Sequence, residues 1–310
     1  MASMDYELNN PAFHLGQEQK PGTVKGAGTR FHKTERLDTG EIIEDLLPAG
    51  RRTENYLIRT PEGPLRELKV MRDLPADPAA GEELARLTGA LPSLTGLLPV
   101  IRSGSFPDGA CFSVTEYRDV PTYEKMISML SPLPAMRALA LIYMPAVILA
   151  RCRPNGLFHG GLTPSDILYE PQTGNTISGM GLSQWRTRFF PQLRTRPGQW
   201  YSAPETTDGK SVWQSDQYAL GIMLFQLLTG VLPFRADSAG ELAAMHRERT
   251  MPLPQERNPQ IHTLPAVNAA ILRMTMKDPS ERYESWEQLL ADLGRINSSL
   301  KRKEKATGNI

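Results

Sequence analysis

The secondary-structure signals of this 310-residue chain change type once, near Val120. Before this point, the segments Asn55–Thr60 and Leu65–Val70 have strand character, and the Pro- and Gly-containing stretch Thr60–Pro64 predicts a turn between them. A chain whose strands come first and whose helices follow is expected to fold as an α+β protein. Helical spacing predicts one early helix at Asp77–Leu91 and later helices at Ala135–Arg151, Gln214–Thr229, Ala239–Glu248, Ala266–Met276 and Ser285–Asn297.

Composition limits the classes of function. The net charge of +1 gives no reason to expect nucleic acid as a partner, and a chain of this length with 40% hydrophobic residues can bury a substantial core. Cys111 and Cys152 lack metal or redox spacing, which favours two reduced core thiols. The longest apolar stretch, Ala138–Ala150, is shorter than the ~20 residues that span a bilayer. No segment resembles a signal peptide, so a soluble, cytoplasmic protein without a membrane span is expected.

Short motifs follow one another in a fixed order along the chain. In the first half, residues 65–73 read LRELKVMRD and residues 113–122 read SVTEYRDVPT. In the second half, residues 159–168 read HGGLTPSDIL, residues 201–205 read YSAPE, residues 216–221 read DQYALG and residues 277–283 read KDPSERY.

Together these motifs resemble those of bacterial Hanks-type Ser/Thr protein kinases, from about Glu41 to Leu293. The corresponding family patterns are V-A-I-K, the hinge, H-R-D-L-K-P-x-N-I-L, A-P-E, the Asp that begins a buried helix, and D-P-x-x-R-Y. The resemblance implies a bilobal kinase-like fold over residues 39–298, with a small β-rich N-lobe (39–117) and a larger helical C-lobe (118–298). Residues 1–38 are expected to form a flexible tail and residues 299–310 a basic tail.

The groups that carry out phosphoryl transfer in this family are replaced. Gly161 stands where the family has the catalytic Asp, Thr163 where it has Lys, and Asp166 where it has the Asn that binds magnesium. The segment Thr176–Leu182 occupies the D-F-G place, so that Gly179 replaces the second metal-binding Asp. Loss of the base alone removes about 10²–10⁴-fold of rate. The chain is therefore predicted to be a pseudokinase with no metal site.

Nucleotide binding is a separate question. Lys69 occupies the family's lysine position, and Glu83 in the following helix is its candidate partner. The phosphate-covering loop has lost its glycine pattern, and Glu54 is expected to lie near the phosphates. We therefore expect no cofactor, while weak or metal-independent ATP binding at Lys69, Glu83 and the hinge residues Glu116 and Tyr117 stays open.

Four further residues resemble structural members of the family. His159 belongs to the hydrogen-bond network of the catalytic-type loop, and Asp216 is expected to bind the backbone of that loop from the buried helix. Glu205 and Arg282 are expected to form the ion pair that holds the A-P-E segment against the C-lobe.

The segment from Ser183 to Gly198 alternates arginines with aromatic residues. One interpretation is a solvated loop whose aromatics pack on the C-lobe. The other is a partner-docking surface, because Arg and aromatic residues are enriched at binding hot spots, and Thr195 is then a candidate phosphorylation site. The candidate docking residues are Arg186, Phe189, Phe190, Arg194 and Thr195.

The function that these observations predict is that of an inactive scaffold or allosteric regulator in bacterial Ser/Thr phosphorylation signalling. Its partners are then proteins: an active Ser/Thr kinase, a phosphatase or a phosphothreonine-binding domain. Two alternatives stay open, which are a kinase-fold enzyme with unconventional nucleotide-dependent transfer chemistry and a small-molecule sensor that uses the cleft between the lobes.

Overall fold

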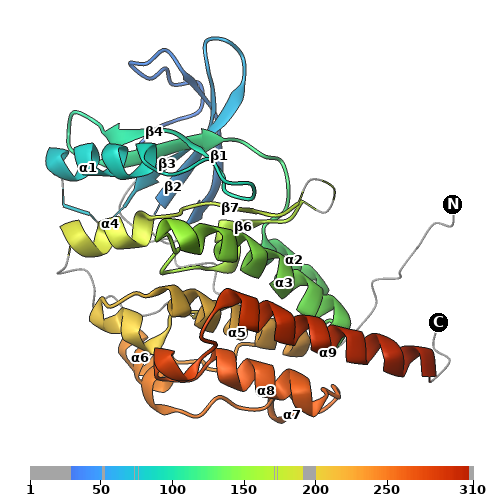
Figure 1. Ribbon diagram of the computed structural model, residues 1–310. Coiled ribbons are helices and arrows are strands. Elements are labelled where there is room, and N and C mark those ends of the chain that lie inside the picture. Colours follow the sequence, from blue (N-terminus) through green and yellow to red (C-terminus); the bar gives the residue numbers. More distant parts are fainter. Residues whose placement is uncertain are drawn as a thin grey trace, which may run out of the picture.

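The computed structural model describes residues 29–50, 53–72, 74–75, 77–170, 172, 174–190 and 200–306. A five-stranded antiparallel sheet lies at one end and a bundle of helices at the other, which confirms the predicted bilobal α+β fold (Figure 1). The sheet has the strand order β1-β2-β3-β5-β4, and the helix that precedes β4 in the chain packs against β4 and β5. The strands are β1 (Ile42–Gly50), β2 (Thr53–Arg59), β3 (Leu65–Met71), β4 (Val100–Ser105) and β5 (Cys111–Glu116).

Local signals explain how the N-lobe begins. The predicted turn closes β2 onto β3, since the backbone N–H of Gly63 donates to Thr60 O at 3.0 Å and Gly63 has a φ of +104°, a conformation that favours glycine. Helix α1 (Pro78–Gly89) begins at Asp77, whose side chain accepts a hydrogen bond from the backbone N–H of Ala79. Both features are local, which is why the sequence predicts them.

The N-terminal boundary differs from the predicted one. Residues 29–38, which fall within the predicted tail, pack on the outer face of the sheet, with Phe31 and Leu37 buried in one cluster with Tyr56. The backbone N–H of Thr34 also donates to Ile43 O at 2.8 Å. No hydrophobic period marks this segment, because it is held by a few aromatic contacts and not by an amphipathic face. Residues 1–28 lie outside the described residues.

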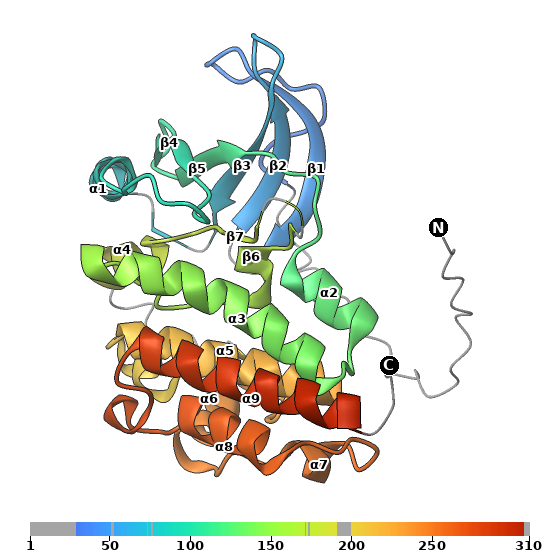
Figure 2. The ribbon, with the colours of Figure 1, turned by 45° about the vertical axis from the view of Figure 1, so that its right-hand side comes forward.

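The C-lobe is built around two apolar helices, α3 (Ala135–Cys152) and α5 (Trp213–Thr229), and Figure 2 shows α9 running alongside α3 and in front of α5. Gly221 lets α5 approach α8 closely, because a Cβ at this position would lie 2.7 Å from Thr275 Cγ2. The remaining elements are α2 (Tyr123–Leu130), β6 (Ile167–Leu168), β7 (Thr176–Ile177), α4 (Leu182–Phe189), α6 (Ala239–Glu248), α7 (Pro254–Arg257), α8 (Pro265–Met274) and α9 (Trp286–Ala306).

Two elements extend beyond the predicted limits. Helix α9 continues through Lys301 to Ala306, so the first part of the predicted basic tail, residues 299–306, is helical. The stretch Ala135–Asn155 is long and apolar enough to cross a membrane by length and composition alone. In this fold it contributes Leu139, Ile142 and Leu149 to the main core, which is the packing of a central core helix.

A buried histidine in α6 provides a test of the core. His246 is 2% exposed, its Nδ1 lies 2.8 Å from Tyr218 Oη, and the Lys277 ammonium donates to its backbone oxygen. Burial, with help from the Lys277 charge, lowers the pKa of His246 to about 4 from 6.5. The neutral ring therefore stabilises the fold above pH 6.5, and this contribution is lost as the pH falls from 6.5 towards 4.

We expect His246→Gln to destabilise the domain more at pH 7.5 than at pH 5. Over the interval from pH 6.5 to 4, the wild type should lose up to about 1.4 kcal/mol per pH unit relative to this variant, because only the wild type takes up the proton on unfolding. Urea unfolding at a series of pH values measures this difference. His262→Gln, at an exposed histidine, is the control and should follow the wild type at every pH.

Candidate functional site

The catalytic-type loop is held from beneath by the first turn of α5. Asp216 is fully buried, and its two carboxylate oxygens accept hydrogen bonds from the backbone N–H groups of His159 at 2.7 Å and Gly160 at 2.8 Å. Burial raises the pKa of Asp216 to about 6, against the opposing effect of His159 and the two N–H donors. The sequence motif assigned this residue the same task, and the geometry shows how it fixes the loop.

The ring of His159 lies beside the two positions that bind metal in the family, with its Nε2 3.8 Å from Asp166 Oδ2. Its Nε2 lies 3.1 Å from the backbone oxygen of Ser178, which places the ring proton on Nε2. Its Nδ1 is buried and has no hydrogen-bond partner among the described residues. His159 is 5% exposed, and its hydrogen bond to Ser178 joins the catalytic-type loop to the D-F-G-like segment.

The position of the family's base is covered by the helix that follows. A Cβ at Gly161 would lie 3.2 Å from Ser183 Oγ, which itself donates to Gly160 O at 3.0 Å. Next to it, the Gln184 side-chain amide donates to Phe158 O at 2.7 Å. Helix α4 thus rests on the loop through two side-chain hydrogen bonds, at the place where a substrate hydroxyl would have to enter.

Of the two positions that bind metal in the family, one keeps a carboxylate, Asp166, and the other is Gly179. Asp166 Oδ2 accepts from the backbone N–H of Thr163 at 2.8 Å and from its hydroxyl at 2.7 Å, so that this carboxylate closes its own turn. Gly179 has a φ of +75°, and a Cβ there would lie 3.3 Å from His159 Nε2. In the part of the chain that the structure describes, no three His, Cys, Asp or Glu side chains gather where a metal ion would be held.

The predicted pair of Lys69 and Glu83 is not formed. Lys69 Nζ lies 3.6 Å from Glu67, two residues earlier on the same face of β3, and both side chains are about one-fifth exposed. Met71 continues this face onto α1. The sequence analysis missed Glu67, although its i, i+2 spacing from Lys69 already places the two side chains together.

Glu83 instead binds two arginines. Its carboxylate accepts from Arg86 one turn later and, at 2.9 Å, from Arg188 Nη1 of α4. The hydrogen bond from Arg86 lowers the pKa of Glu83. The pairing prediction was wrong because α4 sets the orientation of α1, and the sequence of either helix alone carries no sign of this contact.

Glu54 also differs from its expected place. It pairs in register with Val70, and so lies on the outer face of the sheet and not on the face of Lys69. Its carboxylate accepts from the backbone N–H of Arg30 at 2.8 Å and from Arg72 Nε at 3.0 Å. The residue therefore anchors the N-terminal segment and does not face the phosphate position.

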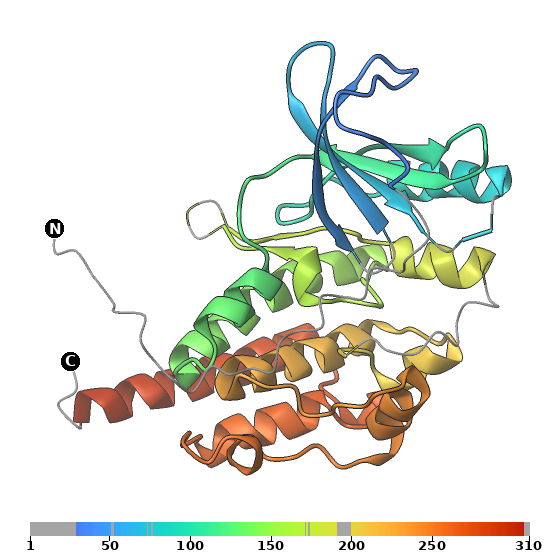
Figure 3. The same cartoon turned by 180° about the vertical axis from the view of Figure 1, so that it is seen from behind.

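Helix α4 links the two lobes (Figures 1 and 3). Trp185 is 1% exposed, and its indole N–H donates to the backbone oxygen of Ala80 in α1 at 2.8 Å. Phe190 stacks edge-on against it at 5.6 Å and is buried in the same cluster. Both aromatic rings thus pack in one cluster with Ala80 and Leu84 of α1.

This arrangement corrects the predicted docking surface. Phe190 is buried and so is not presented to a partner, whereas Phe189 is partly buried against the same cluster and its predicted role stays a prediction. Arg186 is half-buried at the end of the helix. Arg194 and Thr195 lie outside the described residues, and their predicted roles stay predictions.

The hinge residues lie at the end of β5. The Glu116 carboxylate is 57% exposed and lies 3.4 Å from Arg118 Nη2, while the Tyr117 hydroxyl donates weakly to Asp119 at 3.4 Å. Arg118 also binds both oxygens of Glu170 at 2.9 Å. The hinge is therefore held by charged side chains at its outer edge.

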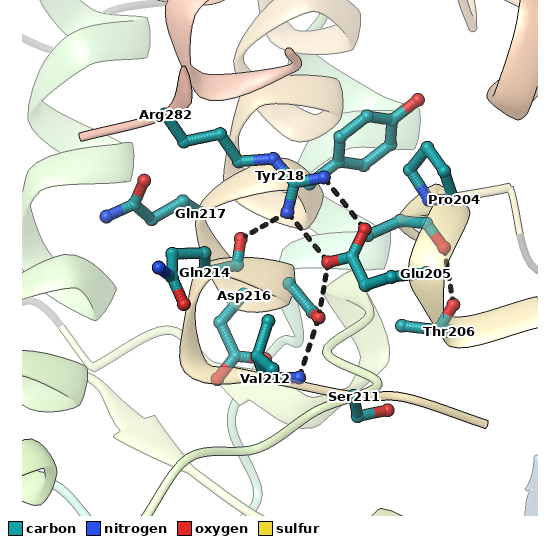
Figure 4. A network of polar contacts seen from close by, with 12 residues as sticks. Pro204, Glu205, Thr206, Ser211, Val212, Gln214, Asp216, Gln217, Tyr218 and Arg282 are labelled. Atoms are coloured by element: carbon teal, nitrogen blue, oxygen red, sulfur yellow. Dashed lines mark hydrogen bonds and ion pairs between the residues drawn. The ribbon is translucent and has the colours of Figure 1, made fainter. Parts of the chain in front are cut away.

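A buried ion pair closes the C-lobe side of the site (Figure 4). Arg282 forms a two-pronged contact with Glu205, with Nη1–Oε1 at 2.7 Å and Nη2–Oε2 at 2.8 Å, and its side chain is fully buried. Ser215 also donates to Glu205 Oε1, at 2.6 Å. The A-P-E-type segment is thereby attached to α5 through Ser215 and to the loop before α9 through Arg282.

A sheet over a helical lobe, with a loop held by an aspartate and a segment held by a buried Glu–Arg pair, is the architecture of protein-kinase-like proteins. No family model matches the chain. It is 30% identical over 221 residues to the serine/threonine-protein kinase pkn3 of Myxococcus xanthus, which covers 67% of this chain and 40% of that protein.

Two further relatives agree. The chain is 30% identical over 189 residues to the serine/threonine-protein kinase PrkC of Bacillus subtilis, which covers 60% of this chain and 29% of that protein. It is 27% identical over 283 residues to the serine/threonine-protein kinase PknB of Mycobacterium leprae, which covers 86% of this chain and 44% of that protein. The chain belongs to the family of bacterial Hanks-type Ser/Thr protein kinases, and it spans less than half the length of each of these relatives.

Proposed function

We propose that this chain is a catalytically inactive member of its family that works as a protein-binding scaffold or allosteric regulator in Ser/Thr phosphorylation signalling. The observation that carries the proposal is the state of the base position, where Gly161 has no side chain and Ser183 of α4 lies against it. An active kinase needs a carboxylate at this position to accept the proton of the substrate hydroxyl.

The metal positions support the same proposal. Phosphoryl transfer depends on ions that neutralise the phosphates, and here Gly179 offers no ligand while Asp166 is occupied with Thr163. Lys69 keeps a charge that could attract phosphate, but the carboxylate of Glu67 lies beside it at 3.6 Å. ATP binding, where it occurs, is then weak and independent of magnesium.

We expect the purified protein to transfer no labelled phosphate from ATP to itself or to a general protein substrate above the level of Lys69→Ala. Loss of the base alone predicts a fall of about 10²–10⁴-fold, and loss of the metal ligands adds to it. The kinase domain of Bacillus subtilis PrkC, assayed in parallel, is the positive control. Phosphate transfer by the wild type that Lys69→Ala abolishes would contradict inactivity.

The melting temperature measured with and without ATP distinguishes a cleft that binds no nucleotide from one that binds it. A ligand at 100 times its dissociation constant stabilises a protein by about 2.7 kcal/mol, which is readily seen as a raised melting temperature. We expect any shift to be equal in magnesium, manganese and chelator. A rise in melting temperature that requires metal would contradict the proposal that the two metal positions no longer bind metal with ATP.

A further inference from the structure

A groove lies in the C-lobe among the α5–α6 loop, α6 and α7, in the lower part of Figure 1. Its volume is about 360 Å³. Five apolar residues line it, of which the three buried ones form its floor, and three exposed arginines stand along its rim. The floor residues are Pro233, Phe234 and Met245, and the rim residues are Arg235, Arg249 and Arg257.

The rim carries three positive charges, and one of them, Arg235, also borders a hollow lined by Asp237 and Glu241. No carboxylate lines the groove, and no ion pair joins any of its three arginines to an acidic residue in the described ranges. Some exposed arginines elsewhere on the described domain are paired, as Arg59 is with Glu44 and Arg295 with Asp292, while others, such as Arg137 and Arg151, stand apart from one another on α3. Since the whole chain has a net charge of only +1, three arginines at one groove are a local feature of this surface.

Hydrogen bonds join the elements on either side of the groove. Arg257 Nη2 donates to Pro233 O at 3.1 Å and Asn258 Nδ2 to Thr229 O at 3.1 Å, so that α7 is attached to the α5–α6 loop. Beneath the floor, Phe234 packs edge-on against His246, with their ring centroids 5.1 Å apart. A preformed site loses less entropy on binding than one that must be ordered by its ligand.

We propose that this groove binds an acidic peptide segment of a partner protein. One apolar side chain of the segment packs on Phe234 and Met245, and flanking Asp or Glu carboxylates pair with the rim arginines, whose planar donors suit them. The inference rests on the proposed function in one respect, that the chain acts by binding a protein. The groove itself is lined by none of the catalytic-position residues.

Charge also favours a peptide over a nucleic acid. The adjoining hollow, which shares Arg235, is lined by Asp237 and Glu241. A regular polyanion that ran along this surface would meet those carboxylates, whereas a short peptide can place its charges at the rim and end there.

Selection from a library of random dodecapeptides displayed on phage tests the proposal. Peptides selected on the wild type are expected to be rich in Asp and Glu around an apolar residue. The variant Arg235→Glu/Arg249→Glu changes two exposed rim residues whose side chains make no hydrogen bond or ion pair with the described part of the chain. It should bind a fluorescein-labelled selected peptide at least about tenfold more weakly, because each close charge pair is reversed.

The matched control is Arg137→Glu/Arg151→Glu, which makes the same change of charge at two exposed positions on α3. It should bind the labelled peptide as the wild type does, and unchanged melting temperatures show that both variants fold. Selection without acidic enrichment, or equal binding by all three proteins, would overturn the proposal.

A nucleic-acid ligand would give a third pattern. A labelled oligonucleotide that binds the wild type and the control, but not the rim variant, would assign the groove to nucleic acid and overturn the peptide proposal. The proposed function fails separately, through phosphate transfer that depends on Lys69, a result that peptide binding does not affect.

Discussion

Replacing Arg282 with alanine is expected to lower the free energy of unfolding by about 3–5 kcal/mol, the range found when one partner of a buried ion pair is removed. The side chain is fully buried, and besides Glu205 it donates to the backbone oxygens of Gln214 at 2.9 Å and Met276 at 2.8 Å. Alanine leaves the Glu205 carboxylate and these carbonyl groups without their donors. Urea unfolding measures the loss directly.

Two comparisons make the test specific. Arg295→Ala removes an arginine that is 78% exposed and paired with Asp292, so its effect should lie within about 1 kcal/mol of zero. Arg282→Lys keeps the charge but not the planar two-pronged contact, and should fall between the two. An Arg282→Ala variant as stable as Arg295→Ala would show that the buried pair does not hold the A-P-E-type segment.

A double-mutant cycle separates the pair from its surroundings. Glu205→Ala also leaves one buried charge unpaired, while the combined variant leaves none. We therefore expect the double variant to lose less stability than the sum of the two single variants, because the residues are in direct contact.

The sequence predicts most of the framework because the relevant signals are local. Helix α6 begins and ends at the predicted residues, since Ser238 caps its first turn by accepting from the backbone N–H of Glu241 at 3.1 Å. Helix α5 was predicted to start one residue late, at Gln214, and it ends at Thr229, before Gly230 with a φ of +78°. The residues that form these caps, Ser238 and Gly230, can be recognised in the sequence itself.

The site is less predictable because it depends on contacts between distant segments. Trp185 and Ala80 are 105 residues apart, and no feature of either segment indicates that the indole donates to that carbonyl. The orientation of Glu83 follows from this contact, as does the burial of Phe190. A spacing of Leu182, Trp185 and Phe189 suits one face of a helix, and this is the one signal from which α4 could have been expected.

Replacing Trp185 with alanine is expected to destabilise the domain by about 3–5 kcal/mol, as for other large aromatic residues removed from a core. Part of this loss should be local to α4. That helix has eight residues, too few to be stable in water without tertiary packing, and Trp185 is its fully buried contact with α1. The hydrogen bonds of Ser183 and Gln184 to the catalytic-type loop should then be lost as well.

Hydrogen exchange measured by mass spectrometry locates the effect. In Trp185→Ala, backbone amides of α4 and the loop at residues 158–163 should exchange faster, while those of α5 keep their protection. Arg188→Ala, whose side chain is 67% exposed, is the matched control in the same helix and should change stability by about 1 kcal/mol or less. Trp185→Phe keeps the ring packing without the N–H donor, and its stability should lie between those of Trp185→Ala and Arg188→Ala.

Equal exchange in α4 for the wild type and Trp185→Ala would mean that the tryptophan does not hold this helix over the base position. Faster exchange without any gain of phosphate transfer would show that inactivity follows from the missing groups at Gly161 and Gly179, with the covering helix as a second and separate obstacle.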